Sequence, residues 1–107
     1  MLYDTVRDKG AKDQIRLRET WKIIRSAKPK TVLDIGCNDG TFSATFASHG
    51  ISTIGVDINK KRLDQAHDRY CSRDYYKNLT FVHHAAETLS ELFNLPTFPS
   101  SILITLS

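Results

Sequence analysis

The chain has 107 residues, 40% of them hydrophobic, which suits one compact domain and excludes a second within this length. The net charge of +3 is small, but nine of the 15 lysines and arginines lie in residues 1–30, against four acidic residues there. No apolar run approaches the roughly 20 residues that span a bilayer, and Asp4 and Asp8 interrupt the start, where a secretory signal would be apolar. Because Cys37 and Cys71 stand alone, we expect a reduced protein with no thiol metal site. Together with the missing signal and membrane span, this predicts a cytoplasmic protein with no membrane partner.

Helical and strand patterns alternate along the chain. A helix is predicted over 12–27, where apolar residues recur at near-helical intervals, and "KPK" at 28–30 ends it. These apolar residues are Ile15, Trp21, Ile23, Ile24 and Ala27. The further predicted elements are a strand at 31–35, a helix at 41–49 closed by Gly50, a strand at 51–58, a helix at 60–71 capped by Asn59, a strand at 79–84, a short helix at 87–94 and a strand at 101–107. The helix at 60–71 is expected to bury one face, which carries Leu63, Ala66, His67 and Tyr70. Strands separated by helices of this length pair in parallel through right-handed crossovers. We therefore predict an α/β fold, a doubly wound Rossmann-like parallel sheet of about four strands with helices on both faces. The single domain comprises a leading basic helix in 1–30 and a core in 31–107.

A glycine-framed loop follows the first predicted strand, at the edge of the sheet where such folds bind ligands. Gly36 and Gly40 frame "GCNDG", and residues without a Cβ allow positive φ and close approach of a ligand. Asn38 between them also tolerates a tight turn. Asp57 lies 21 positions after Gly36, at the end of the second strand, where an acid can accept hydrogen bonds from both hydroxyls of a ribose.

Two classes of ligand use this arrangement. A dinucleotide site calls for G-x-G-x-x-G, whereas this loop offers only G-x-x-x-G. It also places Asp34 and Asp39 where a pyrophosphate needs neutral or positive surroundings. An acid at Asp34 instead suits a ligand that carries an ammonium or sulfonium charge.

The stretches "VLDIGCNDGTF" and "GVDINKKRLDQA" resemble the first two motifs of the class I S-adenosylmethionine-dependent methyltransferases, and the resemblance extends over about residues 31–107. It implies that the glycine loop holds the methionine part of S-adenosylmethionine, mainly through backbone groups and the acid. The positions that it assigns to this loop are Asp34, Gly36, Cys37 and Gly40, and Asn38 of the same loop is a further candidate for cofactor binding.

The resemblance also assigns the rest of the cofactor. It implies that Asp57 binds the ribose diol, that Ile58 packs on the adenine and that the backbone N–H of Ala86 meets the ring. This sequence departs from the family at Ala85 and Ser101, where an acid is common. The family's sheet has seven strands and this chain has residues for four, so the open edge of "ILITL" favours self-association, a partner chain or a longer enzyme.

Several residues have a simpler interpretation beside a functional one. Cys37 near a helix start has the position of a nucleophile, but no histidine is adjacent in sequence to activate it. His83 and His84 are successive strand residues that point to opposite faces, so they do not chelate one metal ion easily. Trp21 is expected in the core, although Tyr3, Arg7 and Trp21 also have the character of residues that close over a cofactor.

Three hypotheses about function follow. The first is an S-adenosylmethionine-dependent methyltransferase or the cofactor-binding part of one, with no catalytic residue identified. The second is a module that binds the cofactor without transferring its methyl group, and the third is a fragment that binds nothing. The methyl acceptor is not identified. The basic residues of 1–30 favour an acidic acceptor such as RNA, while a solvated helix face is the simpler interpretation of them.

Overall fold

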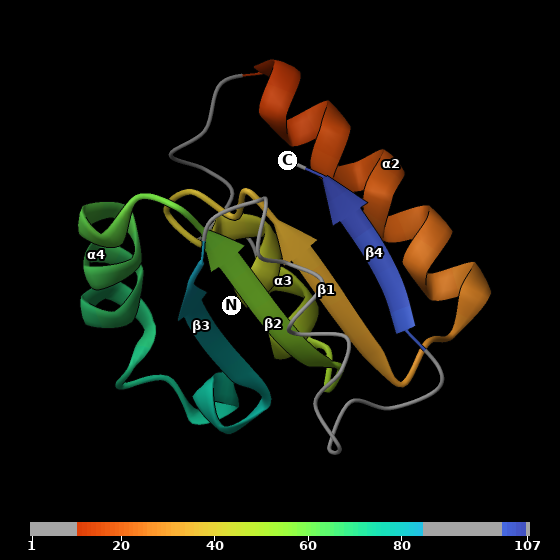
Figure 1. The fold of residues 1–107 in the computed structure, drawn as a ribbon. Helices are drawn as coiled ribbons and strands as arrows, with labels where there is room; N and C mark the ends of the chain where they lie inside the picture. The colour runs from red at the N-terminus through yellow and green to blue at the C-terminus, as the bar shows by residue number, and fades with distance from the viewer. Residues whose placement is uncertain (1–10, 85–101, 107) are drawn as a thin grey trace.

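The computed structural model describes residues 11–84 and 102–106. Its elements are α2 (Ala11–Ala27), β1 (Thr31–Ile35), α3 (Thr41–Ser48), β2 (Ser52–Asp57), α4 (Lys60–Tyr70), the 3₁₀ helix η1 (Asp74–Asn78), β3 (Leu79–His83) and β4 (Ile102–Leu106). All four strands are parallel and form one sheet in the order β3-β2-β1-β4 (Figure 1). The predicted α/β class and the predicted number of strands are therefore confirmed.

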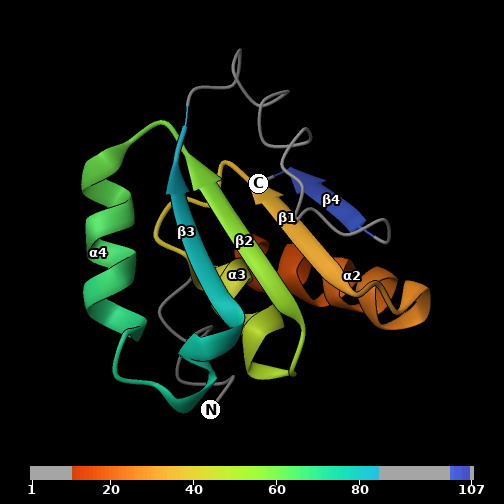
Figure 2. The ribbon, with the colours of Figure 1, turned by 60° about the horizontal axis from the view of Figure 1, so that its bottom comes forward.

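The helices α2, α3 and α4 lie on the same face of the sheet (Figures 1 and 2). The short helix predicted at 87–94 lies outside the described residues, so its place relative to the sheet stays a prediction. None of the helices in the described part of the chain has both the length and the apolar character needed to cross a membrane.

Two clusters of side chains fill the space between the sheet and its helices. One joins α2 and α3 to β1, with Leu17, Ile24, Val32 and Phe46 buried and Trp21 packed against them. The other joins α3, α4 and β3, and its members are Ala44, Ala47, Tyr70 and Leu79, with Tyr75, Tyr76 and Phe81 packed against them. Together these clusters fix α3, and the loop before it, between its two neighbouring helices.

The opposite face of the sheet has its own apolar cluster. Leu33 and Val56 are buried there, and Ile35, Ile54 and Val82 pack against them. Alternation along each strand sends neighbouring residues to opposite faces, so β1 contributes Val32 to the cluster under the helices and Leu33 and Ile35 to this one.

The helix faces differ from the sequence prediction at four positions. Ile15, Ile23 and Ala27 were counted with the apolar residues of the leading helix, yet all three are exposed, Ile15 by 55% and Ile23 by 62%. His67 was placed on the buried face of α4 but is exposed, and it hydrogen bonds to the Tyr76 hydroxyl across 2.7 Å. The reason in each case is the width of the covered stripe: the sheet and α3 cover only the sides of α2 and α4 that carry Leu17, Ile24 and Leu63.

Candidate cofactor-binding site

The glycine loop is tied to the end of the neighbouring strand. Ile35 of β1 is paired with Val56 of β2, so the residues that follow both strands lie at one edge of the sheet. The backbone N–H groups of Gly36 and Cys37 both donate to the Val56 carbonyl, at 2.7 and 3.0 Å. The loop therefore turns across the end of β2 and brings residues 36–40 next to Asp57.

Three residues of this loop have left-handed backbone conformations. The φ angles are +73° at Gly36, +55° at Asn38 and +83° at Gly40. Such angles strain most residues with a Cβ, whereas glycine and, to a lesser degree, asparagine adopt them readily. Gly40 then starts α3 as its N-cap, and its N–H donates to the Cys37 carbonyl at 2.9 Å. The sequence signal of glycines and an asparagine thus corresponds to a tight turn.

Gly40 is also fixed by packing. A Cβ on this residue would lie 2.7 Å from Cζ of Phe81 and 3.1 Å from the Cβ of Ala66. Since real Cβ atoms do not approach carbon this closely, the Phe81 ring of β3 supports the loop only because position 40 is glycine.

Asp57 lies between the glycine loop and the start of α4. Its Oδ2 accepts the backbone N–H of Asn38 at 2.8 Å, and its Oδ1 accepts that of Asn59, also at 2.8 Å. A carboxylate offers about four lone-pair sites, so each oxygen keeps capacity for one more donor. The side chain is half-buried. Asp57 therefore orders the loop and can still accept hydrogen bonds from the two hydroxyls of a diol.

Asp34 lies near the end of β1, directly beneath α3. It is completely buried, and Ser43 of α3 donates its hydroxyl proton to Asp34 Oδ2 across 2.7 Å. Its carboxylate therefore faces the underside of α3 and presents no surface to a ligand in this conformation. The contact expected between Asp34 and a cationic ligand therefore stays a prediction.

Cys37 is 3% exposed within the same loop. Burial raises the pKa of its thiol far above the ordinary value, and the carboxylates of Asp34 and Asp57 raise it further. A thiol in these surroundings stays protonated and is a poor nucleophile. This supports the backbone role predicted for Cys37 over a catalytic one.

The residues after Asp57 form the outer rim of the site. Ile58 is 66% exposed, which leaves its side chain available to a flat ligand, and its carbonyl contacts His83 Nε2 at 2.9 Å. The N–H of His84 donates to the Asp57 carbonyl at 3.0 Å, so the ends of β2 and β3 are joined at this rim. Ala86, the predicted adenine contact, lies outside the described residues. No group of His, Cys, Asp or Glu side chains in the described ranges is arranged to hold a metal ion.

Gly55 supports the site and was missed by the sequence prediction. A Cβ on this β2 residue would lie 2.8 Å from Ser43 Oγ, 2.9 Å from Cδ1 of Phe81 and 3.1 Å from Cys37 Sγ. Position 55 therefore leaves room for the packing beneath the loop. A glycine within the strand pattern "STIGVD" was the available signal, because such a glycine marks the close approach of other atoms.

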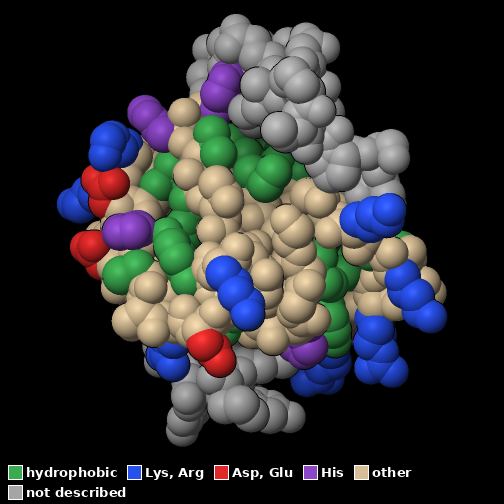
Figure 3. Space-filling model, turned by 90° about the horizontal axis from the view of Figure 1, so that it is seen from below, with side chains coloured by type: hydrophobic (Ala, Val, Ile, Leu, Met, Phe, Trp, Pro, Cys, Tyr) green, Lys and Arg blue, Asp and Glu red, His purple; other side chains and the backbone are tan. Residues whose placement is uncertain are grey.

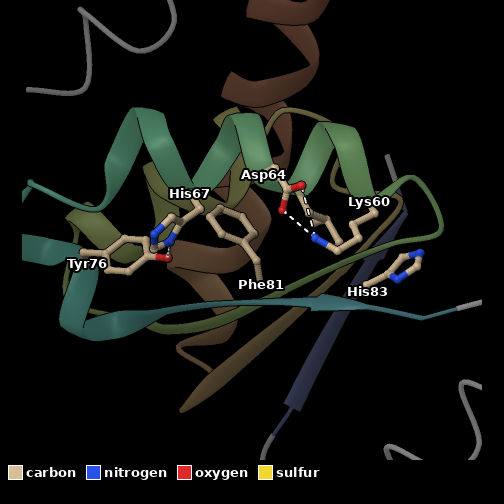
Figure 4. Close-up of a pocket in the computed structure, with 7 residues that line it drawn as sticks. Lys60, Asp64, His67, Tyr76, Phe81 and His83 are labelled. Carbon is tan, nitrogen blue, oxygen red and sulfur yellow. Dashed lines mark hydrogen bonds and ion pairs between the residues drawn. The ribbon is translucent and has the colours of Figure 1, made fainter.

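A separate groove of about 240 Å³ lies between α4 and β3 (Figure 4). Its seven lining residues are Lys60, Leu63, Asp64, His67, Tyr76, Phe81 and His83. Lys60 and Asp64 are joined across 3.0 Å on α4, and the Phe81 ring lies between α4 and β3. The groove shares Phe81 with the packing beneath Gly40 and His83 with the rim of the candidate site at Ile58.

A parallel sheet with a glycine loop after β1 and an acid at the end of β2 defines a Rossmann-like architecture. The family model of the methyltransferase domain matches residues 32–102, and the chain belongs to the class I S-adenosylmethionine-dependent methyltransferase family. The matched range contains both halves of the site, the glycine loop and Asp57. The resemblance seen in the two sequence motifs is thereby confirmed.

A methyltransferase of known sequence resembles this chain over part of its length. The chain is 38% identical over 52 residues to the ubiquinone biosynthesis O-methyltransferase of Nitrosomonas europaea, and the match covers 49% of this chain and 22% of that protein. The chain thus matches about a fifth of the length of this curated relative.

Solved structures share the fold. A Klebsiella pneumoniae protein assigned as an O-methyltransferase superposes with a TM-score of 0.69 at 16% identity, covering 96% of this chain and 47% of that one. The glycopeptide N-methyltransferase MtfA complexed with sinefungin gives a TM-score of 0.66 at 15% identity, covering 82% of this chain and 35% of that one.

Proposed function

We propose that this chain binds S-adenosylmethionine at the glycine loop and serves as the cofactor-binding part of a methyltransferase. The observation that carries the proposal is the position of Asp57, which joins the loop to the end of β2 through two hydrogen bonds of 2.8 Å. The family membership supports methyl transfer in general, and the sinefungin complex of MtfA supports a ligand of this kind in the shared fold.

The described residues fit the cofactor at two of its parts. The unused acceptor sites of the Asp57 carboxylate match a ribose diol, and the exposed Ile58 side chain offers an apolar surface for an adenine ring. The left-handed turn through Gly36 and Gly40 lets a ligand approach the backbone without meeting a Cβ.

The charge of the site also fits. Asp34, Asp39 and Asp57 lie in or beside the loop and give it a negative potential, which favours a sulfonium or ammonium group over a phosphate. Asp34 contributes from below, with its position fixed by Ser43.

The bound cofactor would supply an activated methyl group. The chain's own residues then have a limited task, which is to hold the donor in a fixed orientation so that an acceptor can approach in line. Asp57 fixes the ribose, the loop backbone receives the amino-acid end, and the packing of Phe81 beneath Gly40 keeps the loop rigid.

Isothermal titration of the chain with S-adenosylhomocysteine tests the proposal. Wild type should bind saturably, and Asp57→Asn should weaken binding at least about tenfold, because the amide retains one acceptor oxygen and loses the negative charge. Asp68→Asn, which removes the same charge from an exposed position on α4, is the matched control and should bind like wild type.

Two outcomes would contradict the proposal. One is a folded wild-type chain that shows no saturable heat, and the other is an Asp57→Asn variant that binds as tightly as wild type. Circular dichroism of all three proteins guards against loss of the fold, since Asp57 also holds the backbone of Asn38 and Asn59.

A further inference from the structure

The outward side of α2, with the turn that follows it, forms a basic surface. It is defined by seven residues, which are Lys12, Arg16, Arg18, Lys22, Arg25, Lys28 and Lys30. All seven are exposed, while the acidic residues of the same stretch are Asp13 and Glu19. The charge excess in the sequence is therefore displayed on the surface of the fold.

Three of these side chains form a continuous row. Arg18, Lys22 and Arg25 are spaced at i, i+4 and i+7, which places them along one side of the helix. Lys22 also pairs with Glu19 at 3.3 Å, with both side chains more than 60% exposed, so this ion pair is weak and easily exchanged. Like charges at these spacings repel one another, and a bound polyanion relieves that repulsion.

The molecular surface shows the same asymmetry. In Figure 3, blue Lys and Arg side chains gather on the side where α2 lies, with no red side chain among them on that view. On the side of α4 the blue and red side chains are intermixed, in keeping with the Lys60–Asp64 pair. The basic surface is thus a property of one side of the molecule.

One residue of the basic surface contacts the first turn of α3. Arg16 lies over the ring of Phe42, with its guanidinium carbon 5.4 Å from the ring centre. Phe42 belongs to the first turn of α3, the helix that starts at Gly40. Arg16 lies on the other flank of α2 from the row of Arg18, Lys22 and Arg25, so the basic residues extend around the exposed part of the helix.

We infer that the basic surface of α2 binds a nucleic-acid chain through its phosphates. A row of cations with a spacing of about 5–6 Å per step suits a regular series of phosphates. Ile15 and Ile23 are exposed but stand apart among charges, so α2 has no continuous apolar stripe of the kind that enters a membrane interface. Nucleic-acid binding by this surface does not depend on the proposed function. The further idea that the bound nucleic acid is the methyl acceptor does rest on that function.

Fluorescence anisotropy with a labelled 20-nucleotide single-stranded RNA tests this inference over 50 to 200 mM KCl. The test variant is the triple substitution Arg18→Gln, Lys22→Gln and Arg25→Gln. Its matched control is Lys61→Gln, Arg62→Gln and Lys77→Gln, which removes the same charge from exposed residues of α4 and η1. A DNA oligonucleotide of equal length shows whether the ribose hydroxyls contribute.

We expect the test variant to bind the RNA about tenfold or more weakly than wild type at 100 mM salt, and the control to bind within about threefold of wild type. The slope of log K against log salt should fall by about 2 in the test variant, from a loss of about 0.7 for each of the three cations. Equal weakening in the two triple variants would overturn the inference, because it would show a response to net charge alone.

Two further readouts complete the test. Binding to vesicles of phosphatidylcholine and phosphatidylserine that exceeds RNA binding at the same salt would also overturn the inference. Titration of the test variant with S-adenosylhomocysteine separates the two proposals, since the substituted residues lie outside the loop and cofactor binding should stay at the wild-type level. If the test variant binds RNA more weakly and still binds S-adenosylhomocysteine like wild type, the result supports the basic surface as the RNA-binding site. If wild type binds RNA but does not bind S-adenosylhomocysteine, only the proposed function is contradicted.

Discussion

Replacement of Gly40 by alanine is the sharpest test of how the loop is held. The new methyl group would lie 2.7 Å from Cζ of Phe81 and 3.1 Å from the Cβ of Ala66, in a backbone with φ of +83°. Gly50 provides a matched control, because it has the same φ of +83° and a Cβ there would meet nothing within 4 Å. The two variants therefore share the backbone strain and differ in the clash.

The expected magnitudes follow from these two contributions. A left-handed conformation costs a residue with a Cβ about 1–2 kcal/mol, partly offset by the lower entropy of the unfolded chain, so Gly50→Ala should lose about 1 kcal/mol. Overpacking a well-filled core adds about 1–3 kcal/mol, so Gly40→Ala should lose about 2–4 kcal/mol. The difference between the variants measures the contact with Phe81.

Urea unfolding followed by tryptophan fluorescence can measure this difference. The chain has a single tryptophan, and Trp21 stacks on Phe46 with ring centres 6.5 Å apart, so its emission reports the packing of α2 on α3. The midpoint for Gly40→Ala should fall below that for Gly50→Ala by about 1 M urea, given a slope of about 1–3 kcal/mol per molar.

A second substitution decides the cause. In the background of Phe81→Ala the ring that meets the new methyl group is gone and only the 3.1 Å approach to the Cβ of Ala66 remains, so most of the excess cost of Gly40→Ala over Gly50→Ala should disappear. Equal losses for the two glycine variants in the wild-type background, or an unchanged excess after removal of the ring, would refute the account of Gly40 as a packing position.

Three further predictions concern the cysteines and a helix cap. In the native protein Cys71, which is exposed, should react quickly with a thiol reagent such as 5,5′-dithiobis(2-nitrobenzoic acid), while Cys37 reacts only on unfolding; a Cys71→Ser variant that still reacts at once would contradict the buried, protonated thiol. Because burial raises the pKa of the Cys37 thiol, the contribution of this thiol to the free energy of unfolding is fully present below its unfolded pKa of about 9 and is lost as the pH rises above that value. Urea unfolding from pH 8 to 10.5 should therefore show that wild type loses up to about 1.4 kcal/mol of stability per pH unit above pH 9 relative to Cys37→Ala. Asn59→Ala should lose about 1 kcal/mol of stability, because the Asn59 side chain caps α4 by accepting the Arg62 N–H at 3.2 Å; an unchanged urea midpoint would count against this cap.

The order of the elements was predictable because local rules set it. The helix at 60–71 and its Asn59 cap were expected from the sequence and are found at Lys60–Tyr70. The strands of β1 to β4 begin and end within one residue of the predicted bounds. The 3₁₀ helix at Asp74–Asn78 was not predicted, since a single short turn has little periodic signal.

The candidate site was predictable only in part. The spacing between the glycine loop and Asp57 indicated that they lie together, and the structure places the Asn38 N–H 2.8 Å from the Asp57 carboxylate. The burial of Asp34 and its hydrogen bond with Ser43 could not be predicted from that spacing. Ser43 is nine positions away on a different element and comes close only because α3 packs on β1.

The sequence by itself determined the fold class, the left-handed turns at Gly36 and Gly40 and the clustering of positive charge in residues 1–30, because φ preferences, hydrophobic periodicity and charge are properties of the chain. The tertiary structure alone decided that Phe81 supports the loop beneath Gly40, that Gly55 leaves room for this packing and that Asp34 is buried. The physical reason is that burial and contact depend on which surfaces the folded helices and strands present to one another, and no local pattern contains that information.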